Sequence, residues 1–205
     1  MARIGSREAE KEAARMAAVL MAAAARTAPK TRGLDSVQTL ILDGEDLEAL
    51  AAAMESKASD KVFALAGFTR DAGQIREAAA VLLIGVTGEP KRINEPLNCG
   101  ACGYGSCAAF VRAEKCVGED FRGPLCMFQA LDLGIALGSA AKMASELNID
   151  NRMMYTIGAA ARKLGLLDCD VIIGFPLSVS GKNPYFDRNA AAREKAHRNG
   201  VQRIP

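Results

Sequence analysis

Apolar and polar residues alternate with two different periods along the first half of the chain, which predicts helices and strands in turn. The alanine-rich segment at the start has a helical pattern and ends before Pro29. A short continuous apolar run such as Val-Leu-Leu-Ile-Gly-Val is typical of a strand that is covered on both faces. The predicted elements are helices at 6–26, at 46–57 and within 60–80, and strands at 37–42 and 81–86.

The second half continues this alternation after a cysteine-rich interruption. Residues 127–147 and 151–164 are predicted to be helices, the second closed by Gly165, and 171–175 is predicted to be a third strand. From residue 189 the chain is predicted to be a charged helix without an apolar stripe. We therefore expect a three-layer α+β arrangement, in which helices cover a small sheet.

Composition narrows the class of protein. The chain has 205 residues, 50% of them hydrophobic, with a net charge of +2, which indicates a globular protein and gives no sign of nucleic-acid binding. Its apolar runs are shorter than the roughly 20 residues of a membrane span. The N-terminus imitates a signal peptide, but Glu8, Glu10 and Glu12 break the pattern. We expect a cytoplasmic protein whose cysteines are ligands or reduced thiols.

Three cysteines lie in one glycine-rich run, Asn98-Cys-Gly-Ala-Cys-Gly-Tyr-Gly-Ser-Cys107, and a further cysteine follows at position 126. Thiolates two and four residues apart can converge on one inorganic centre where glycines let the backbone turn sharply. We therefore predict a metal centre that is held by Cys99, Cys102, Cys107 and Cys126.

Two cysteines compete for the fourth position. Residues 108–115 have helical composition, and at about 1.5 Å per residue a helix would carry Cys116 roughly 13 Å from Cys107. Gly123 and Pro124 allow the chain to return, which favours Cys126. Cys116 is then expected to be a buried thiol on the inner helix face, although it stays an alternative ligand. Cys169 is expected to be a small core residue.

The spacing also favours one metal over another. Structural zinc prefers two paired C-x2-C knuckles, whereas this chain has one such pair followed by C-x4-C and a distant cysteine. Four thiolates on amide-rich loops suit a [4Fe-4S] cluster. A structural zinc module is the less favoured alternative.

These residues resemble a known module. The pattern C-G-A-C-G-Y-x-x-C, then a helix and a lone cysteine, is similar to the four-cysteine [4Fe-4S] domain of corrinoid iron-sulfur proteins and electron-transport complexes. The whole chain resembles the ferredoxin-domain family DUF2148, whose other marked segments are 134–140 and 176–188. The domains are then a nitroreductase-like scaffold of residues 1–95 and 127–205 and an inserted iron-sulfur module of residues 96–126.

The scaffold resembles nitroreductases in two places. Ala24-Ala-Arg-Thr-Ala-Pro29 is similar to the loop that meets flavin, and Ile172-Ile-Gly-Phe-Pro176 to a late strand end of that fold. The resemblance implies an α+β homodimer that binds FMN between its subunits. The phosphate of FMN could be held by Arg26, Lys30, Arg32 and Arg188, since arginine binds phosphate in bidentate fashion. Solvated loop charges are the alternative interpretation.

Two functions follow from these features. In the first, the cluster passes electrons to FMN for reduction of an unknown small substrate, which would make the chain an FMN-dependent oxidoreductase. In the second, a flavin-free electron relay or interaction protein presents the cluster to a redox partner protein. No Ser-His-Asp arrangement can be built, because the single histidine, His197, lies in the charged tail.

Overall fold

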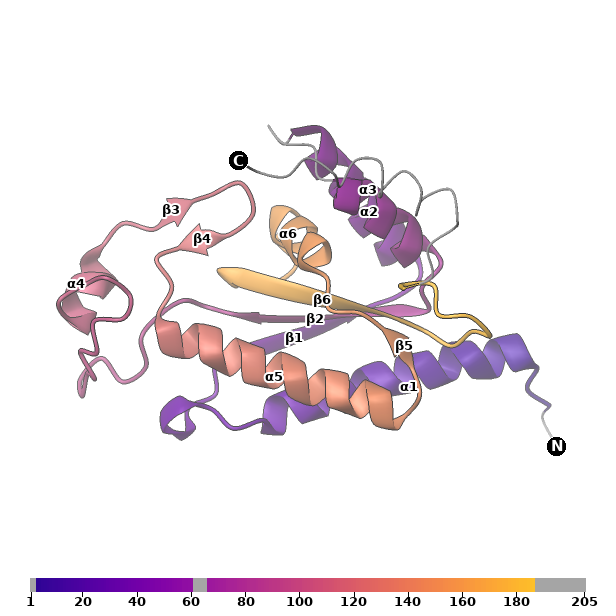
Figure 1. Cartoon of the computed structure of the whole chain (residues 1–205), viewed down its shortest axis with the longest axis horizontal. Helices are drawn as coiled ribbons and strands as arrows, with labels where there is room; N and C mark the ends of the chain where they lie inside the picture. The colour runs from indigo at the N-terminus through magenta and orange to yellow at the C-terminus, as the bar shows by residue number, and fades with distance from the viewer. Residues whose placement is uncertain (1–2, 61–65, 187–205) are drawn as a thin grey trace, which may run out of the picture.

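A computed structural model of the chain describes residues 3–60 and 66–186, in which helices cover both faces of an antiparallel sheet (Figure 1). The four strands lie in the order β1-β2-β6-β5, and each neighbouring pair is antiparallel. Their bounds are Val37–Leu42 for β1, Ala80–Val86 for β2, Asp150–Asn151 for β5 and Val171–Ser178 for β6. This confirms the predicted three-layer α+β fold.

The helices divide between the two faces of the sheet. Helices α1 (Ser6–Thr27) and α5 (Met127–Glu146) cover one face, and α2 (Glu45–Asp60), α3 (Ala66–Arg76) and α6 (Tyr155–Lys163) cover the other. A 3-10 turn, η1 (Thr31–Gly33), joins α1 to β1. The central strand β2 is buried along its whole length, as its continuous apolar run predicted.

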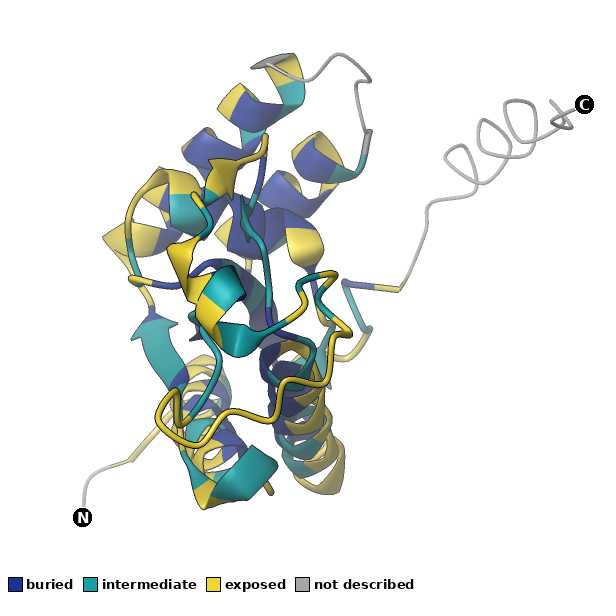
Figure 2. Cartoon of the chain, turned by 90° about the vertical axis from the view of Figure 1, so that its left-hand side faces the viewer, coloured by how far each residue is buried: buried dark blue, intermediate teal, exposed yellow. Residues whose placement is uncertain are grey.

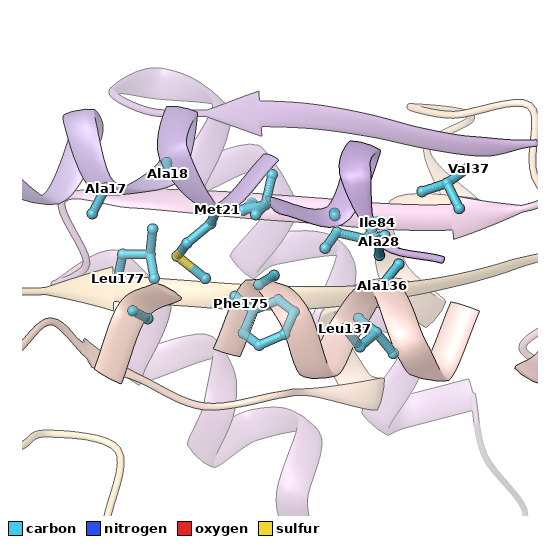
Figure 3. Packing of buried hydrophobic residues seen from close by; sticks show 14 of the residues in the cluster. Ala17, Ala18, Met21, Ala28, Val37, Ile84, Ala136, Leu137, Phe175 and Leu177 are labelled. Atoms are coloured by element: carbon cyan, nitrogen blue, oxygen red, sulfur yellow. The ribbon is translucent and has the colours of Figure 1, made fainter. Parts of the chain in front are cut away.

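Alternate residues of β2 belong to two separate cores. Leu82 and Ile84 pack against α1 and α5, whereas Val81 and Leu83 face the other three helices. Figure 3 shows residues of the first core, among them Met21 of α1, Phe175 of β6 and Leu137 of α5. The period of two that defines a strand therefore distributes one apolar run between two layers.

Helix α6 lies unusually close to β6. A Cβ atom built on Gly158 would lie 1.7 Å from the carbonyl oxygen of Ile172, and one on Gly174 would lie 2.1 Å from Ile157 Cγ2. No side chain larger than hydrogen fits at either position without moving the helix. These two glycines therefore set the spacing between this helix and the sheet.

The cysteine-rich segment forms a small lobe between β2 and α5, at one end of the sheet (Figures 1 and 2). It contains α4 (Cys107–Arg112) and a hairpin of β3 (Cys116–Val117) and β4 (Arg122–Gly123). Phe110 is buried inside the lobe, and its ring meets Tyr104 edge-on with centroids 5.6 Å apart. The lobe is otherwise largely exposed, in contrast to the layered scaffold (Figure 2).

Several boundaries differ from the predictions. The helix expected from residue 151 begins at Tyr155, because Asp150 and Asn151 pair with β6 as a short fourth strand. The helix expected over 108–115 ends at Arg112, and Cys116 lies exposed on β3 instead of buried on a helix. The predicted C-terminal helix lies outside the described residues. Within the residues that are described, no helix is long and apolar enough to cross a bilayer.

Candidate functional site

The four cysteines that the sequence predicts as ligands line one small cavity, in which the volume accessible to water is about 20 Å³. Cys99 is exposed, Cys102 and Cys107 are half-buried, and Cys126 is buried. Among the described residues Cys116 is not part of the cavity wall. The four cysteines therefore differ in exposure, from Cys99 on the solvent side to Cys126 on the scaffold side.

Tight turns bring the first three cysteines to this cavity. Asn98, Gly100 and Gly103 have φ angles of 46°, 75° and 87°, and the Gly103 amide donates to the Gly100 carbonyl at 2.9 Å. The side chain of Asn98 accepts a hydrogen bond from the Cys107 amide at 2.8 Å, which closes the loop. Left-handed backbone is inexpensive for glycine, and asparagine tolerates it better than most residues.

Cys126 reaches the cavity from the scaffold. It is the N-cap residue of the 20-residue helix α5, and its amide donates to the Gly88 carbonyl at 2.8 Å. Met127 and Phe128, in the first turn of that helix, also line the cavity. The positive end of the helix dipole therefore lies at the cavity, where it favours negative charge.

Gln129, on the same turn of α5, binds two loops that lie near the cavity. Its side-chain oxygen accepts from the Ser36 hydroxyl at 2.6 Å, and its nitrogen donates to the Glu89 carbonyl at 2.7 Å. The side chain is 2% exposed. Because Ser36 precedes β1 and Glu89 follows β2, this residue holds both connections against α5.

Asp132, one turn further along α5, makes a second bridge between loops. One carboxylate oxygen accepts from the amide and the hydroxyl of Thr31, both at 2.9 Å, and the other pairs with Lys91. Burial acts to raise the pKa of Asp132, but these hydrogen bonds outweigh it and hold the pKa below its usual value. Thr31 and Lys91 both line the cysteine cavity.

Asp170 fastens the lobe to the sheet just before β6. It is fully buried and accepts hydrogen bonds from the Gly88 amide at 2.7 Å, from Lys115 at 2.6 Å and from Arg122. Burial opposes ionisation, yet these donors hold the pKa of Asp170 below its ordinary value. Since Lys115 precedes β3 and Arg122 is the first residue of β4, one carboxylate fixes the orientation of the hairpin.

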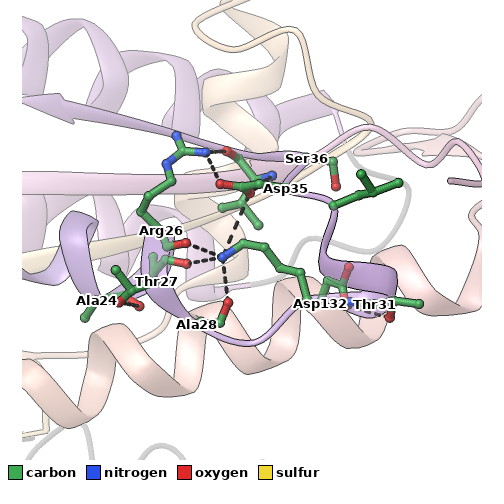
Figure 4. A network of polar contacts seen from close by, with 12 residues as sticks. Ala24, Arg26, Thr27, Ala28, Thr31, Asp35, Ser36 and Asp132 are labelled. Carbon is green, nitrogen blue, oxygen red and sulfur yellow. Dashed lines mark hydrogen bonds and ion pairs between the residues drawn. The ribbon is translucent and has the colours of Figure 1, made fainter. Parts of the chain in front are cut away.

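Three of the four cations predicted to hold a phosphate are bound within the chain. Arg26 pairs with Asp35 at 2.6 Å (Figure 4). Lys30 donates to the carbonyls of Ala25, Arg26 and Ala28 at the end of α1. Arg32, with a φ of 59°, binds Glu95 through its side chain at 3.2 Å and lines the cysteine cavity. Arg188 and His197 lie outside the described residues.

The two remaining cysteines differ in environment. Cys169 is buried beside β6, as predicted, and burial raises the pKa of its thiol to about 12, with Asp168 and Asp170 adding to the effect. Cys116 is exposed on the hairpin. None of the six cysteines forms a disulfide.

The cavity offers the donor type that an iron-sulfur cluster takes. Four thiols line it, and [4Fe-4S] clusters are held by four cysteine thiolates. Among the described residues, no three His, Cys, Asp or Glu side chains, these cysteines included, form a group that could hold a metal ion as they stand. Soft sulfur donors, glycine-rich backbone and the cations Lys91 and Arg32 are compatible with a negatively charged iron-sulfur group.

Sequence reasoning missed the polar residues that hold the cavity walls. Gln129 and Asp132 lie three residues apart in an otherwise apolar helix start, Met-Phe-Gln-Ala-Leu-Asp-Leu. Polar side chains on the buried face of a helix were a usable signal, because such groups require partners. Lys91 and Asp170 carried no comparable pattern, since their partners come from distant parts of the chain.

Comparison with known proteins gives one family and one fold. A family model described as uncharacterized proteins containing a ferredoxin domain, DUF2148, matches residues 122–188, which include Cys126 but not the first three cysteines. An uncharacterized protein of Archaeoglobus fulgidus is 47% identical over 187 residues, which cover 90% of this chain and 97% of that protein.

Two solved structures share the fold at low identity. A nitroreductase-like family protein from Bacillus cereus is 11% identical, with a TM-score of 0.53 over 88% of this chain and 82% of that one. A nitroreductase with bound FMN from Desulfitobacterium hafniense is 12% identical, with a TM-score of 0.50 over 93% and 87% of the two chains. These similarities establish a nitroreductase-like scaffold.

Proposed function

Because the chain belongs to the DUF2148 family of proteins containing a ferredoxin domain, we propose that it is an iron-sulfur redox protein whose cluster is held by Cys99, Cys102, Cys107 and Cys126. One observation carries the ligand assignment: these four thiols line the same cavity, whereas Cys116 lies on the hairpin. When bound, a [4Fe-4S] cluster supplies one-electron transfer. The surrounding residues hold it and set its environment.

The chain's own residues give this site a direction. Cys99 is exposed to solvent, whereas Cys126 is 9% exposed and begins a helix of the scaffold. We propose that electrons enter from a redox partner on the Cys99 side and leave toward the scaffold on the Cys126 side. The free thiols and the solvent-facing site fit a reducing cytoplasm.

We further propose that the scaffold binds FMN in a homodimer and reduces a small substrate. The 3-10 turn after α1 supports this, because Thr31 and Arg32 line the cysteine cavity and lie within three residues of the segment 24–29 that resembles a flavin-binding loop. A flavin at this turn would lie beside the proposed cluster. The similar nitroreductase from D. hafniense was solved with bound FMN.

Our candidates for binding the flavin phosphate stay Arg26, Lys30, Arg32 and Arg188. They differ in how far their side chains are available for a ligand. Lys30 donates to three backbone carbonyls and is 5% exposed, so it is the least available of those described. Arg26 uses one terminal nitrogen and is 52% exposed, which leaves the rest of its guanidinium accessible. Both terminal nitrogens of Arg32 bind Glu95, so Arg26 is the best candidate among the described residues.

The internal pairing of these cations favours one alternative, a flavin-free electron relay. A loop whose cations already bind Asp35 and Glu95 keeps its structure without a phosphate. In that case the scaffold would present the cluster to a partner protein and would carry no substrate site.

One experiment tests both proposals. The protein is purified without oxygen, and iron, acid-labile sulfide, zinc and flavin are quantified per chain. A [4Fe-4S] protein contains roughly four irons and four sulfides, and the flavoprotein also contains about one FMN per chain. Zinc or no metal in place of iron contradicts the cluster, and iron without flavin, even after incubation with FMN, leaves the electron relay.

A further inference from the structure

We infer that the buried Lys91–Asp132 pair sets the reduction potential of the proposed cluster, because one member of the pair lines the cysteine cavity and the other lies behind it. This inference rests on the cluster proposed above. It assigns a role to two residues that are not cluster ligands, and it concerns the potential of the cluster, not its retention.

The two charges are buried and held in place. The Lys91 side chain is 7% exposed and the Asp132 side chain 1% exposed. The Lys91 ammonium donates to Asp132 and to the Leu34 carbonyl, while the second oxygen of Asp132 accepts twice from Thr31. With these bonds neither group can turn toward solvent, so both charges act from fixed positions.

The two members of the pair lie at different depths from the cavity. Lys91 belongs to the cavity wall, together with Cys126 and Cys99, and Asp132 is not part of that wall. Asp132 lies on α5 six positions after Cys126, more than one helical turn into the scaffold. The positive member is therefore the nearer one to the proposed cluster.

A charge in or just behind the cavity wall changes the free energy of adding an electron to the cluster. Reduction makes a four-thiolate cluster one unit more negative, so a nearby cation stabilises the reduced form and a nearby carboxylate opposes it. Burial limits screening by water and salt. In the intact pair the effect of the nearer ammonium exceeds that of the carboxylate behind it, and removal of either member leaves the opposite charge uncompensated.

The same carboxylate connects this effect to the turn at which we place the flavin. Asp132 holds the amide of Thr31, and Lys91 holds the carbonyl of Leu34, so the two charges fix both ends of the 3-10 turn. A displacement of that turn would move the cation that lines the cavity. The pair thereby couples the position of the turn to the potential of the cluster.

The test is a reductive titration of the anaerobically purified full chain with dithionite and mediators at pH 7, followed by electron paramagnetic resonance. Lys91→Met leaves the carboxylate and is expected to lower the midpoint potential. Asp132→Asn leaves the ammonium and is expected to raise it, and Lys91→Arg is expected to restore the wild-type value. Lys142→Met and Glu146→Gln remove an exposed pair on the same helix and serve as controls.

Shifts of opposite sign support the inference, because a merely structural defect would move both potentials in the same direction or neither. Equal, same-signed or absent shifts overturn it, as do control shifts of the same size. If Lys91→Met loses its cluster, Asp132→Asn alone decides: a raised midpoint potential supports the inference, and a lowered or unchanged one overturns it. Loss of the cluster from both folded variants also overturns the inference. A wild-type protein without iron would instead refute the proposed function.

Discussion

Replacement of Asp170 by asparagine is expected to lower the free energy of unfolding by about 2–4 kcal/mol. The Asp170 side chain is fully buried and binds the Gly88 amide, Lys115 and Arg122, so the variant leaves two cations without their common anion. Breaking a buried ion pair costs about 3–5 kcal/mol. Lys115 and Arg122 are 25% and 32% exposed, and water lowers the cost by screening them.

Urea unfolding at pH 7, followed by circular dichroism, measures this difference. Asp168→Asn is the matched control, because Asp168 is 94% exposed and lies 3.7 Å from the same arginine. The control is expected to change stability by less than about 0.5 kcal/mol. If Asp170→Asn costs no more than Asp168→Asn, the buried carboxylate does not fasten the lobe and the reasoning fails.

The pH dependence of the same variant gives a second check. Burial acts to raise the pKa of Asp170, but its bonds to Lys115, the Gly88 amide and Arg122 hold it below its usual value. A carboxyl group with a lowered folded-state pKa stabilises the protein above its unfolded pKa of about 4, and this stability is lost as the pH falls through the folded value. The difference between wild type and Asp170→Asn should therefore shrink below about pH 4. A difference that stays constant between pH 7 and pH 3 would argue against an ionised Asp170.

Two further predictions concern the scaffold and the cluster site. Gly158→Ala places a methyl group 1.7 Å from a carbonyl of β6 and is expected to cost more than the about 1–3 kcal/mol of ordinary overpacking. Gly138→Ala, at an exposed position of α5 with no atom within 4 Å, is expected to stabilise the protein by about 0.5–1 kcal/mol. Thermal unfolding of both variants tests this, and a tolerated Gly158→Ala would show that α6 can shift freely. Cys126→Ser is expected to lower the iron content of anaerobically purified protein well below that of wild type, whereas Cys116→Ser keeps it; the reverse result would make Cys116 the fourth ligand.

The layered scaffold could be read from the sequence because its signals are local. The strand at 37–42 was predicted with its exact bounds, and the first helix and the strand at 81–86 each differ from the structure by one residue. Alanine content, apolar periodicity and breaking prolines act within a few residues, so neighbouring positions suffice to locate these elements. The fourth strand was missed because two residues become a strand through a partner far along the chain.

The four-cysteine ligand set stays a prediction, but the turns around it could be read from the sequence in part. The glycines predicted the turns that bring Cys99, Cys102 and Cys107 together, and Cys126 was preferred over Cys116. The argument for that preference was wrong in one respect, because the helix after Cys107 is too short to carry Cys116 away. The hairpin does so instead, and it is fixed by Asp170, which no spacing in the sequence connects to the lobe.

The cations show a different limit of sequence reasoning. Charged residues in a loop indicate where binding could occur, but their partners decide whether they are available. Lys30 completes the end of α1 with three hydrogen bonds to carbonyls, a use that a phosphate-binding interpretation of the same residue did not anticipate. Helix ends leave several carbonyls without partners, and a nearby lysine is a common solution.

The position of Cys126 has a consequence for how the lobe could be transplanted or could have been acquired. Three of the thiols belong to a loop of nine residues, but the fourth starts a helix whose next turns are part of the scaffold core. A fragment excised at residue 126 would lose the part of the cavity wall that Met127 and Phe128 supply, so the lobe is not a self-contained module. In the proposed cluster site the fourth thiol is in place only once α5 has packed against the scaffold, and incorporation of iron would then report that this helix has docked.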